Sequence, residues 1–582
     1  MFLALTSQTE FWDAGEEILF AGQWCARHDR RDDWKELRHR VLPSPWDDVD
    51  RYRRAVVYCA ETVERLLGPL TEHLNEALSV RRSTHYWRIL LGRWFAYHVQ
   101  QMYDHYVIVE DAFATDPEIK TLRLDPASFV VPKDTLDFIQ LSLKDAYHLQ
   151  IFSPFLAARG RTLPMRRLHP ENAPLVLVYP RKRGIVFLKR VLSRIFASIV
   201  PPGLGDVLVN ELNLNRGERR KLFLGSRLKA LPYLAELPPD MKFEPVWDKK
   251  REGLARIAEG RDAFERALIA SLPHHFPTLY LEGYETARNF SLARLWRRPR
   301  VIFSAMGWDC SEAFKFAAAE SAEHGSRVWS IQHGGFYGFA EHADAEDFER
   351  SIADRFYGWG WAELAKDPKV RNLPHPQLSR VGAPAPGDGI LFTPIAMAFH
   401  HMRLGRNLVS SKLGNDYIER QARFLRALPE DLKKKTATRL HVDFGWRHQE
   451  RLRELFPTLR VDDPTKSFPA QLRKARVAVF DCPMTTFLEA FAAGIPSVLS
   501  WSPNAWTFRP EARPFIDNLR EAGILFDEPE AAARQVARVY GDPRAWWDSP
   551  AVRGAHQDFA AHFALSRADW LDLWLEEIRG TQ

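Results

Sequence analysis

Residues 477–498 read VAVFDCPMTTFLEAFAAGIPSV and contain a pattern from which a fold class can be predicted. An apolar run ends at Asp481, and a turn with a proline leads to Thr485 and Thr486 at the start of a predicted helix. Gly494 ends that helix, and a second apolar run follows. A strand, a turn, a helix and another strand in this order predict a unit of a parallel α/β sheet.

The start of this predicted helix suits a phosphate. Free backbone N–H groups and the helix dipole favour an anion beside Thr485 and Thr486. Glu489 follows one turn later, where its carboxylate is placed to accept hydrogen bonds from ribose hydroxyls. The alternative is an ordinary capped helix with a solvated glutamate. The repeated β/α pattern around it favours a nucleotide site.

The same pattern recurs on both sides of a Pro/Gly run at residues 382–389. Strands alternating with helices predict parallel sheets with right-handed crossovers. We therefore expect two doubly wound, Rossmann-like α/β domains facing each other across a cleft, comprising residues 1–383 and 384–582. After the run, strands are predicted at 390–396, 439–444, 459–462, 477–480, 495–500 and 524–526; before it, they are predicted at 301–305, 327–333 and 355–360.

The first domain carries a predicted helical elaboration at its N-terminus. Short strands near residues 2–6 and 18–22 lead into long amphipathic helices at 50–77 and 83–106. Residues 170–250 are rich in proline and basic residues and show weak periodicity, which predicts an insertion or lid.

A second motif, SIQHGGFYG at residues 330–338, follows another apolar run. It places His333 at the carboxyl end of a strand, the edge at which α/β sheets bind ligands. Gly334 and Gly335 let backbone N–H groups approach an anion closely. His333 is thus a candidate catalytic or phosphate-contacting group, with Gln332 beside it. The alternative is a turn histidine in an ordinary Gly-Gly loop.

Composition narrows the class of protein. Of 582 residues, 46% are hydrophobic and 27% charged, which is typical of a folded chain of two or more domains. The net charge of +6 is small for this length and no nucleic-acid-binding motif accompanies it, so we expect no nucleic-acid partner. The 19 tryptophans are compatible either with a carbohydrate site or with core packing.

Targeting features are few. Four cysteines without a CxxC pair indicate a reducing, cytoplasmic environment. The N-terminal residues predict a buried strand rather than a signal peptide, and no apolar run approaches the ~20 residues of a transmembrane helix. Residues 181–196 alternate basic and bulky apolar side chains. They predict either a peripheral contact with the inner face of the cytoplasmic membrane or a partly buried helix with a solvated basic face.

Further polar residues lie near predicted strand ends. Arg447 is suited to clamp a phosphate, and Asp443 to hold a histidine or a sugar hydroxyl, unless the two form a structural ion pair. The candidate catalytic residues are His333, Asp309 and Asp443. The candidate donor-binding residues are Gln332, Gly334, Gly335, His400, His441, Arg447, Asp481, Thr485, Thr486 and Glu489.

These motifs carry a family resemblance. The strand and turn before Thr485-Thr486, the Glu489-Ala490 pair and Gly494-Ile495-Pro496 resemble the nucleotide-sugar half of GT-B glycosyltransferases. The Gln332-His333-Gly334-Gly335 motif resembles a Gln-His-Gly element of capsule and teichoic-acid type enzymes. Along nearly its whole length the chain also resembles a family of transferases of similar size from bacterial surface-polysaccharide loci, such as those for O-antigen or capsule.

The resemblance implies a glycosyltransferase that uses no metal or other cofactor. The nucleotide-sugar donor would bind near Thr485, Thr486 and Glu489, and His333 would deprotonate the acceptor hydroxyl or contact the donor phosphate. No DxD pair that would suit a metal-dependent enzyme is present in a suitable loop. A CMP-linked nonulosonate or Kdo is one candidate donor, and a surface glycan or protein, lipid-linked or free, is the expected acceptor. Three alternatives stay open: a CDP-polyol phosphotransferase, a nucleotide-sugar epimerase of the same fold and a non-catalytic carbohydrate-binding protein.

Overall fold

The computed structural model describes residues 1–160, 162–168, 204–295, 297–395, 398–400, 404–405, 414–440, 443–463, 465–503 and 505–581. The chain divides into two compact units. The first comprises residues 1–212, 228–328 and 400–405, and the second comprises residues 213–227, 329–399 and 406–582. Within the described residues, no helix combines the length and the apolar character needed to cross a membrane.

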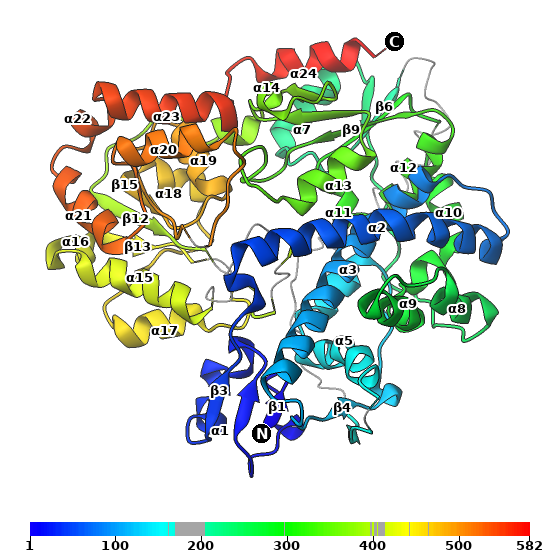
Figure 1. The fold of residues 1–582 in the computed structure, drawn as a ribbon. Coiled ribbons are helices and arrows are strands. Elements are labelled where there is room, and N and C mark those ends of the chain that lie inside the picture. The colour runs from blue at the N-terminus through cyan, green and yellow to red at the C-terminus, as the bar shows by residue number, and fades with distance from the viewer. Residues whose placement is uncertain are drawn as a thin grey trace. The chain divides into compact units, whose positions relative to one another are not determined.

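The second unit contains a six-stranded parallel sheet (Figure 1). Its strand order, β14-β13-β12-β15-β16-β17, reverses direction between β12 and β15, as in doubly wound dinucleotide-binding sheets. Ligands of such sheets bind at the carboxyl ends of the strands beside this reversal. The strands are β12 (Gly389–Thr393), β13 (Thr436–Thr438), β14 (Arg460–Val461), β15 (Ala475–Phe480), β16 (Ser497–Ser500) and β17 (Leu525–Phe526), and all five neighbouring pairs are parallel.

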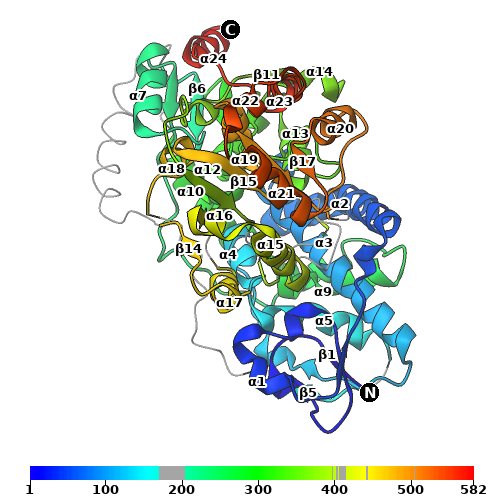
Figure 2. The same ribbon diagram turned by 90° about the vertical axis from the view of Figure 1, so that its left-hand side faces the viewer.

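Strand β15 shows why this sheet is covered on both faces. Its side chains alternate: Ala478 and Phe480 join one hydrophobic cluster, whereas Val477 and Val479 join the other. Because both faces are buried, the strand is apolar at every central position and lacks the alternation of a half-exposed strand. Helices lie on both faces (Figure 1 and Figure 2). They include α15 (Asn415–Ala427), α17 (His448–Leu455), α19 (Thr485–Ala492), α20 (Arg513–Glu521), α21 (Pro529–Val539) and α23 (Pro550–Phe563).

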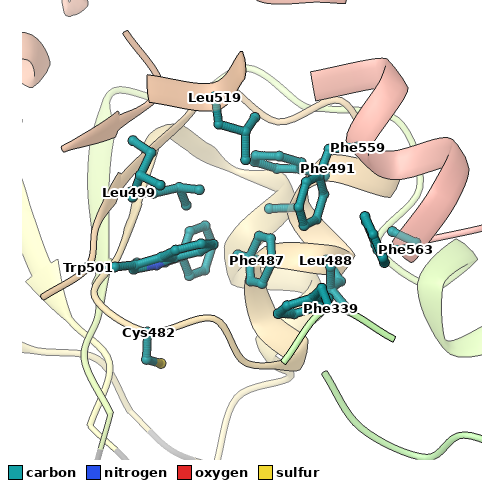
Figure 3. Packing of buried hydrophobic residues seen from close by; sticks show 14 of the residues in the cluster. Phe339, Cys482, Phe487, Leu488, Phe491, Leu499, Trp501, Leu519, Phe559 and Phe563 are labelled. Carbon is teal, nitrogen blue, oxygen red and sulfur yellow. The ribbon is translucent and has the colours of Figure 1, made fainter. Parts of the chain in front are cut away.

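An aromatic cluster fixes helix α19 on one face of this sheet. Phe487 and Phe491 of α19 pack against Phe559 of α23, with ring centroids 5.6 and 5.9 Å apart (Figure 3). Trp501, just after β16, lies 5.1 Å from Phe487 in a T-shaped arrangement. Such contacts orient α19 and therefore the residues at its N-terminus.

A second six-stranded sheet has the order β11-β10-β9-β8-β6-β7. The pairs β6–β7, β6–β8, β9–β10 and β10–β11 are parallel. Its strands are β6 (Val207–Asn210), β7 (Ala230–Pro232), β8 (Val301–Ser304), β9 (Arg327–Ile331), β10 (Arg355–Gly358) and β11 (Val370–Asn372). Helix α13 (Asp344–Ile352) separates β9 and β10 in sequence, as a parallel crossover requires.

The N-terminal elaboration belongs to the first unit. A small parallel sheet, β1 (Phe2–Ala4), β2 (Ile18–Phe20) and β3 (His39–Val41), precedes the long helices α2 (Val49–Leu78) and α3 (Thr84–Thr115). Helix α3 packs against α2, α5 (Asp145–Ala157) and α12 (Glu312–Glu323). These neighbours explain why 21 of its residues are buried.

The predicted fold class, parallel α/β sheets with a helical N-terminal part, is confirmed. The strand predicted at 439–444 is wrong in position, because β13 occupies 436–438, where two β-branched threonines lie buried in the sheet. The described part of 170–250 contains β6, β7 and helix α7 (Arg216–Gly225). Strand β6 is short and buried on both faces, so it has no alternating pattern to detect. The segment 181–196 lies outside the described residues.

Candidate active site

The site in the second unit is built on a hydrogen bond between a loop and the first residue of helix α19. The N–H of Gly335 donates a hydrogen bond to Oγ1 of Thr485 over 2.8 Å. A Cβ atom at position 335 would lie 2.4 Å from the carbonyl carbon of Met484 and 2.5 Å from the nitrogen of Thr485, so only glycine fits there. At Gly334 the nearest atom to such a Cβ is Oγ1 of Thr485, at 3.8 Å. The loop after β9 therefore lies directly against the N-terminus of α19.

Gln332 holds the beginning of this loop. Its side chain is fully buried. Its Oε1 accepts one hydrogen bond from the backbone N–H of Trp359 at 3.0 Å and another from the indole Nε1 of Trp361 at 2.8 Å. Its Nε2 donates to the carbonyl of Gly334 over 2.9 Å. Phe336, four residues after Gln332, adopts a φ of 49°, in the left-handed region that costs energy for a bulky residue. The loop is thus held in one conformation by its neighbours.

His333 lies beside a buried carboxylate. Its Nδ1 is 3.1 Å from Oε1 of Glu349 on α13 and 3.3 Å from the hydroxyl of Tyr337. The side chain of His333 is 18% exposed, whereas that of Glu349 is 2% exposed. A partly exposed imidazole bonded to a buried carboxylate is an arrangement used for general acid–base chemistry.

Glu489 lies one turn into α19 and is buried. Gln377 donates a hydrogen bond to its Oε1 over 2.8 Å. Burial raises the pKa of Glu489 to about 7, against the opposing effects of the Gln377 hydrogen bond and the Arg380 charge. Arg380 pairs with Glu218 at 2.7 Å. A carboxyl group with this pKa can respond to a ligand near neutral pH.

Asp481 occupies the point where the strand order reverses. Thr393 pairs in register with Phe480, so Asp481 follows at the carboxyl end of β15, beside the end of β12. Its Oδ1 accepts a hydrogen bond from the Ile395 N–H at 2.9 Å and its Oδ2 accepts one from Gln421 at 2.8 Å. Burial raises the pKa of Asp481 to about 7. The hydroxyl of Thr393 is buried and has no hydrogen-bond partner among the residues that the structure describes.

The remaining predicted residues differ in their contacts. Asp443 accepts hydrogen bonds from the N–H groups of Gly445 and Arg447 at 3.1 Å, and Arg447 pairs with Glu450 at 3.2 Å, so the described contacts of this pair close a turn before α17. Thr486 is half-buried in the first turn of α19. In the first unit, Asp309 forms an ion pair with Arg93, and His400 is buried against Asp145. His441 lies outside the described residues. In the described part of the chain, no group of three or more His, Cys, Asp or Glu side chains is arranged to hold a metal ion.

A family model described as LIC12162 family transferase matches residues 1–578. The chain belongs to this family. Membership of the LIC12162 family makes the protein a transferase. No match was found among curated proteins.

Solved structures similar to this LIC12162 family member are only distantly related. The wall teichoic acid polymerase TagF is 8% identical, with 68% of this chain and 94% of that chain covered and a TM-score of 0.33. An α,α-trehalose-phosphate synthase (UDP-forming) from Burkholderia vietnamiensis is 13% identical, with 64% and 98% covered and a TM-score of 0.35. The Anabaena protein HepE, in complex with UDP and glucose, is 11% identical, with 64% and 98% covered and a TM-score of 0.34.

Sequence reasoning missed several partners of the site in this LIC12162 family transferase. Glu349 and Tyr337 contact His333, and Gln377 contacts Glu489. Tyr337 follows His333 by four residues and lies within the SIQHGGFYG motif, but nothing in the local sequence pattern indicated that its hydroxyl would contact His333. Gln377 and Glu489 are 112 residues apart, so their pairing could only be found in three dimensions.

Proposed function

We propose that this LIC12162 family transferase is a glycosyltransferase of the GT-B type, which moves a sugar from a nucleotide-activated donor without a metal ion. The hydrogen bond between Gly335 and Thr485 carries this proposal, because it brings the loop of His333 to the N-terminus of α19. A histidine suited to proton transfer and a helix end suited to a phosphate thus share one site.

The donor nucleotide would occupy the carboxyl ends of β12 and β15. The diphosphate or monophosphate would bind the first N–H groups of α19, near Thr485 and Thr486. The Glu489 carboxylate would accept hydrogen bonds from the ribose hydroxyls. The hydroxyl of Thr393 is buried and has no hydrogen-bond partner in the described part of the chain, which supports a polar ligand at this edge of the sheet.

His333 would act as the base. As the acceptor hydroxyl attacks the anomeric carbon, its proton would pass to the imidazole, and the sugar–phosphate bond would break toward the nucleotide. The helix dipole of α19 would stabilise the charge that develops on the leaving phosphate, the role that a divalent ion has in metal-dependent enzymes.

The proposed donor and acceptor are inferred from the sequence. A CMP-linked acidic sugar of the nonulosonate or Kdo type is the donor class we favour, with a surface glycan or a protein as acceptor. We place the enzyme in the cytoplasm, with residues 181–196 as a contact to the inner face of the membrane or to a lipid-linked acceptor. A CDP-polyol phosphotransferase is the alternative reaction at the same site.

The test is a thermal-shift screen of the purified full chain with CMP, CDP, UDP, GDP and dTDP. A nucleotide at one hundred times its dissociation constant adds about 2.7 kcal/mol of stability. We expect one nucleotide to stabilise the wild type and to lose most of its effect with Glu489→Gln. The control is Glu521→Gln, an exposed glutamate on α20, which should behave as the wild type. Absence of any shift would contradict the proposal. In a second screen with nucleotide sugars and CDP-alcohols, a CDP-alcohol that stabilises better than any nucleotide sugar would favour the phosphotransferase.

A further inference from the structure

The buried carboxylate of Glu349 contacts several groups around His333. Tyr337 donates its hydroxyl hydrogen to Oε1 of Glu349 over 3.1 Å, and Ser330 donates to Oε2 over 3.3 Å. Oε1 is also the atom that lies 3.1 Å from Nδ1 of His333. Glu349 is therefore the acceptor at the centre of a small network beside the imidazole.

These contacts favour one of the two ring forms of neutral His333. Tyr337 has one hydroxyl hydrogen, which it donates to Glu349. Its oxygen also lies 3.3 Å from Nδ1 of His333, and toward this nitrogen it can act only as an acceptor. The Glu349 oxygen beside Nδ1 is an acceptor as well. These contacts favour the ring form with hydrogen on Nδ1, which in the neutral ring leaves the basic lone pair on Nε2.

We propose that Glu349 is a positioning residue for His333, holding the imidazole in the form whose Nε2 accepts the proton of the acceptor hydroxyl. This inference rests on the proposed function. When the acceptor oxygen bonds to the anomeric carbon, the hydroxyl proton moves to Nε2 and the electron pair of the breaking bond leaves with the nucleotide phosphate. The imidazolium formed in this step lies beside the Glu349 carboxylate, which stabilises it.

Glu346 provides a matched control on the same helix. It is also buried, but it accepts hydrogen bonds from the Gly338 N–H at 2.9 Å, from Arg350 at 3.0 Å and from Arg509 at 2.9 Å. Its described partners are thus a backbone group and two arginines. A general effect of neutralising a buried glutamate on α13 would appear in Glu346→Gln as well as in Glu349→Gln.

The experiment is NMR of the full chain labelled with ¹⁵N-histidine, in which two-bond ¹H–¹⁵N couplings distinguish the two ring forms. The His333 signals are assigned by their loss in His333→Gln. We expect hydrogen on Nδ1 in the wild type and in Glu346→Gln, and a shift toward hydrogen on Nε2 in Glu349→Gln, whose amide can donate to Nδ1. Glu349→Asp, which keeps the charge, should retain much of the wild-type form. Thermal unfolding shows whether each variant is folded.

Hydrogen on Nε2 of His333 in the wild type would overturn the inference without any variant, and so would an unchanged ring form in folded Glu349→Gln. With a sugar donor of the nucleotide that the thermal screen identifies, Glu349→Gln should lower kcat on the order of 10²- to 10⁴-fold with little change in KM. If no nucleotide binds but the ring form changes as expected, the proposed function fails while the positioning of His333 by Glu349 is supported.

Discussion

Gly335 and Thr485 are 150 residues apart in sequence, yet the backbone N–H of the first donates a 2.8 Å hydrogen bond to the side-chain hydroxyl of the second. This contact joins the loop after β9 to the N-terminus of α19 within the second unit. It brings together the motif of His333 and the motif of Thr485, from which a transferase site is proposed. Single substitutions at either residue of the hydrogen bond can test this geometry.

Gly335→Ala should disrupt this junction. The added methyl group would meet backbone atoms of Met484 and Thr485 at 2.4–2.5 Å, and the backbone cannot move away without shifting α19. We expect a loss of about 1–3 kcal/mol in the free energy of unfolding, measured by urea denaturation. Gly334→Ala is the control, because its methyl group would make only ordinary contacts. Equal losses in both variants would contradict the described packing.

Thr485→Val tests the hydrogen bond itself. Valine keeps the branched shape but removes the hydroxyl that accepts the Gly335 N–H, at a cost of about 1–3 kcal/mol if that donor stays buried and unpaired. Thr485→Ser keeps the acceptor and should recover most of the stability. A valine variant as stable as the serine variant would show that the bond is not formed in solution.

The raised pKa of Glu489 predicts a pH-dependent cost in stability. The ordinary value of 4.5 rises to about 7 in the folded protein, so the folded state favours the protonated form. The contribution of protonated Glu489 to the free energy of unfolding is therefore fully present below pH 4.5, and it is lost as the pH rises through about 7. Relative to Glu489→Gln, the wild type should lose on the order of 3 kcal/mol between pH 4.5 and pH 8. Urea denaturation across this range measures the difference, and a constant difference would contradict the prediction.

Nucleotide binding should release a proton near pH 6.5. Ribose hydroxyls that donate to Glu489 would favour its charged form and lower its pKa from about 7. Calorimetric titrations in two buffers with different ionisation enthalpies measure the number of protons released. The release should disappear in Glu489→Gln but persist in the surface variant Glu521→Gln. Binding without proton release would place the ribose away from Glu489.

The aromatic cluster around Phe487 should govern the position of α19. Phe487 is fully buried against Phe339, Phe491, Trp501 and Phe559 (Figure 3). Phe487→Ala should cost about 3–5 kcal/mol in the free energy of unfolding, because the cavity it leaves cannot fully collapse. Phe487→Leu should cost less. A small effect of the alanine variant in urea denaturation would indicate that α19 is held by other contacts.

Local patterns in the sequence were sufficient for the fold class and for several parts of the site. The apolar run before Asp481 and the helix beginning at Thr485 depend on residues close together in the chain, so periodicity and turn chemistry predicted them. The same holds for the strand that ends next to Gln332 and His333. Strand β6 was missed because burial on both faces removes the alternation by which a strand is detected.

The sequence by itself determined that His333 follows a strand and that Thr485 begins a helix, because both depend on neighbours in the chain. Only the tertiary structure decided that Gly335 meets Thr485, that Glu489 is bonded by Gln377 and that Glu349 accepts from the groups around His333. Such pairings arise when packed elements bring distant side chains together, and they leave no periodic pattern in a single sequence. The burial that raises the pKa of Glu489 is likewise a property of the packed core and not of the helix that carries it.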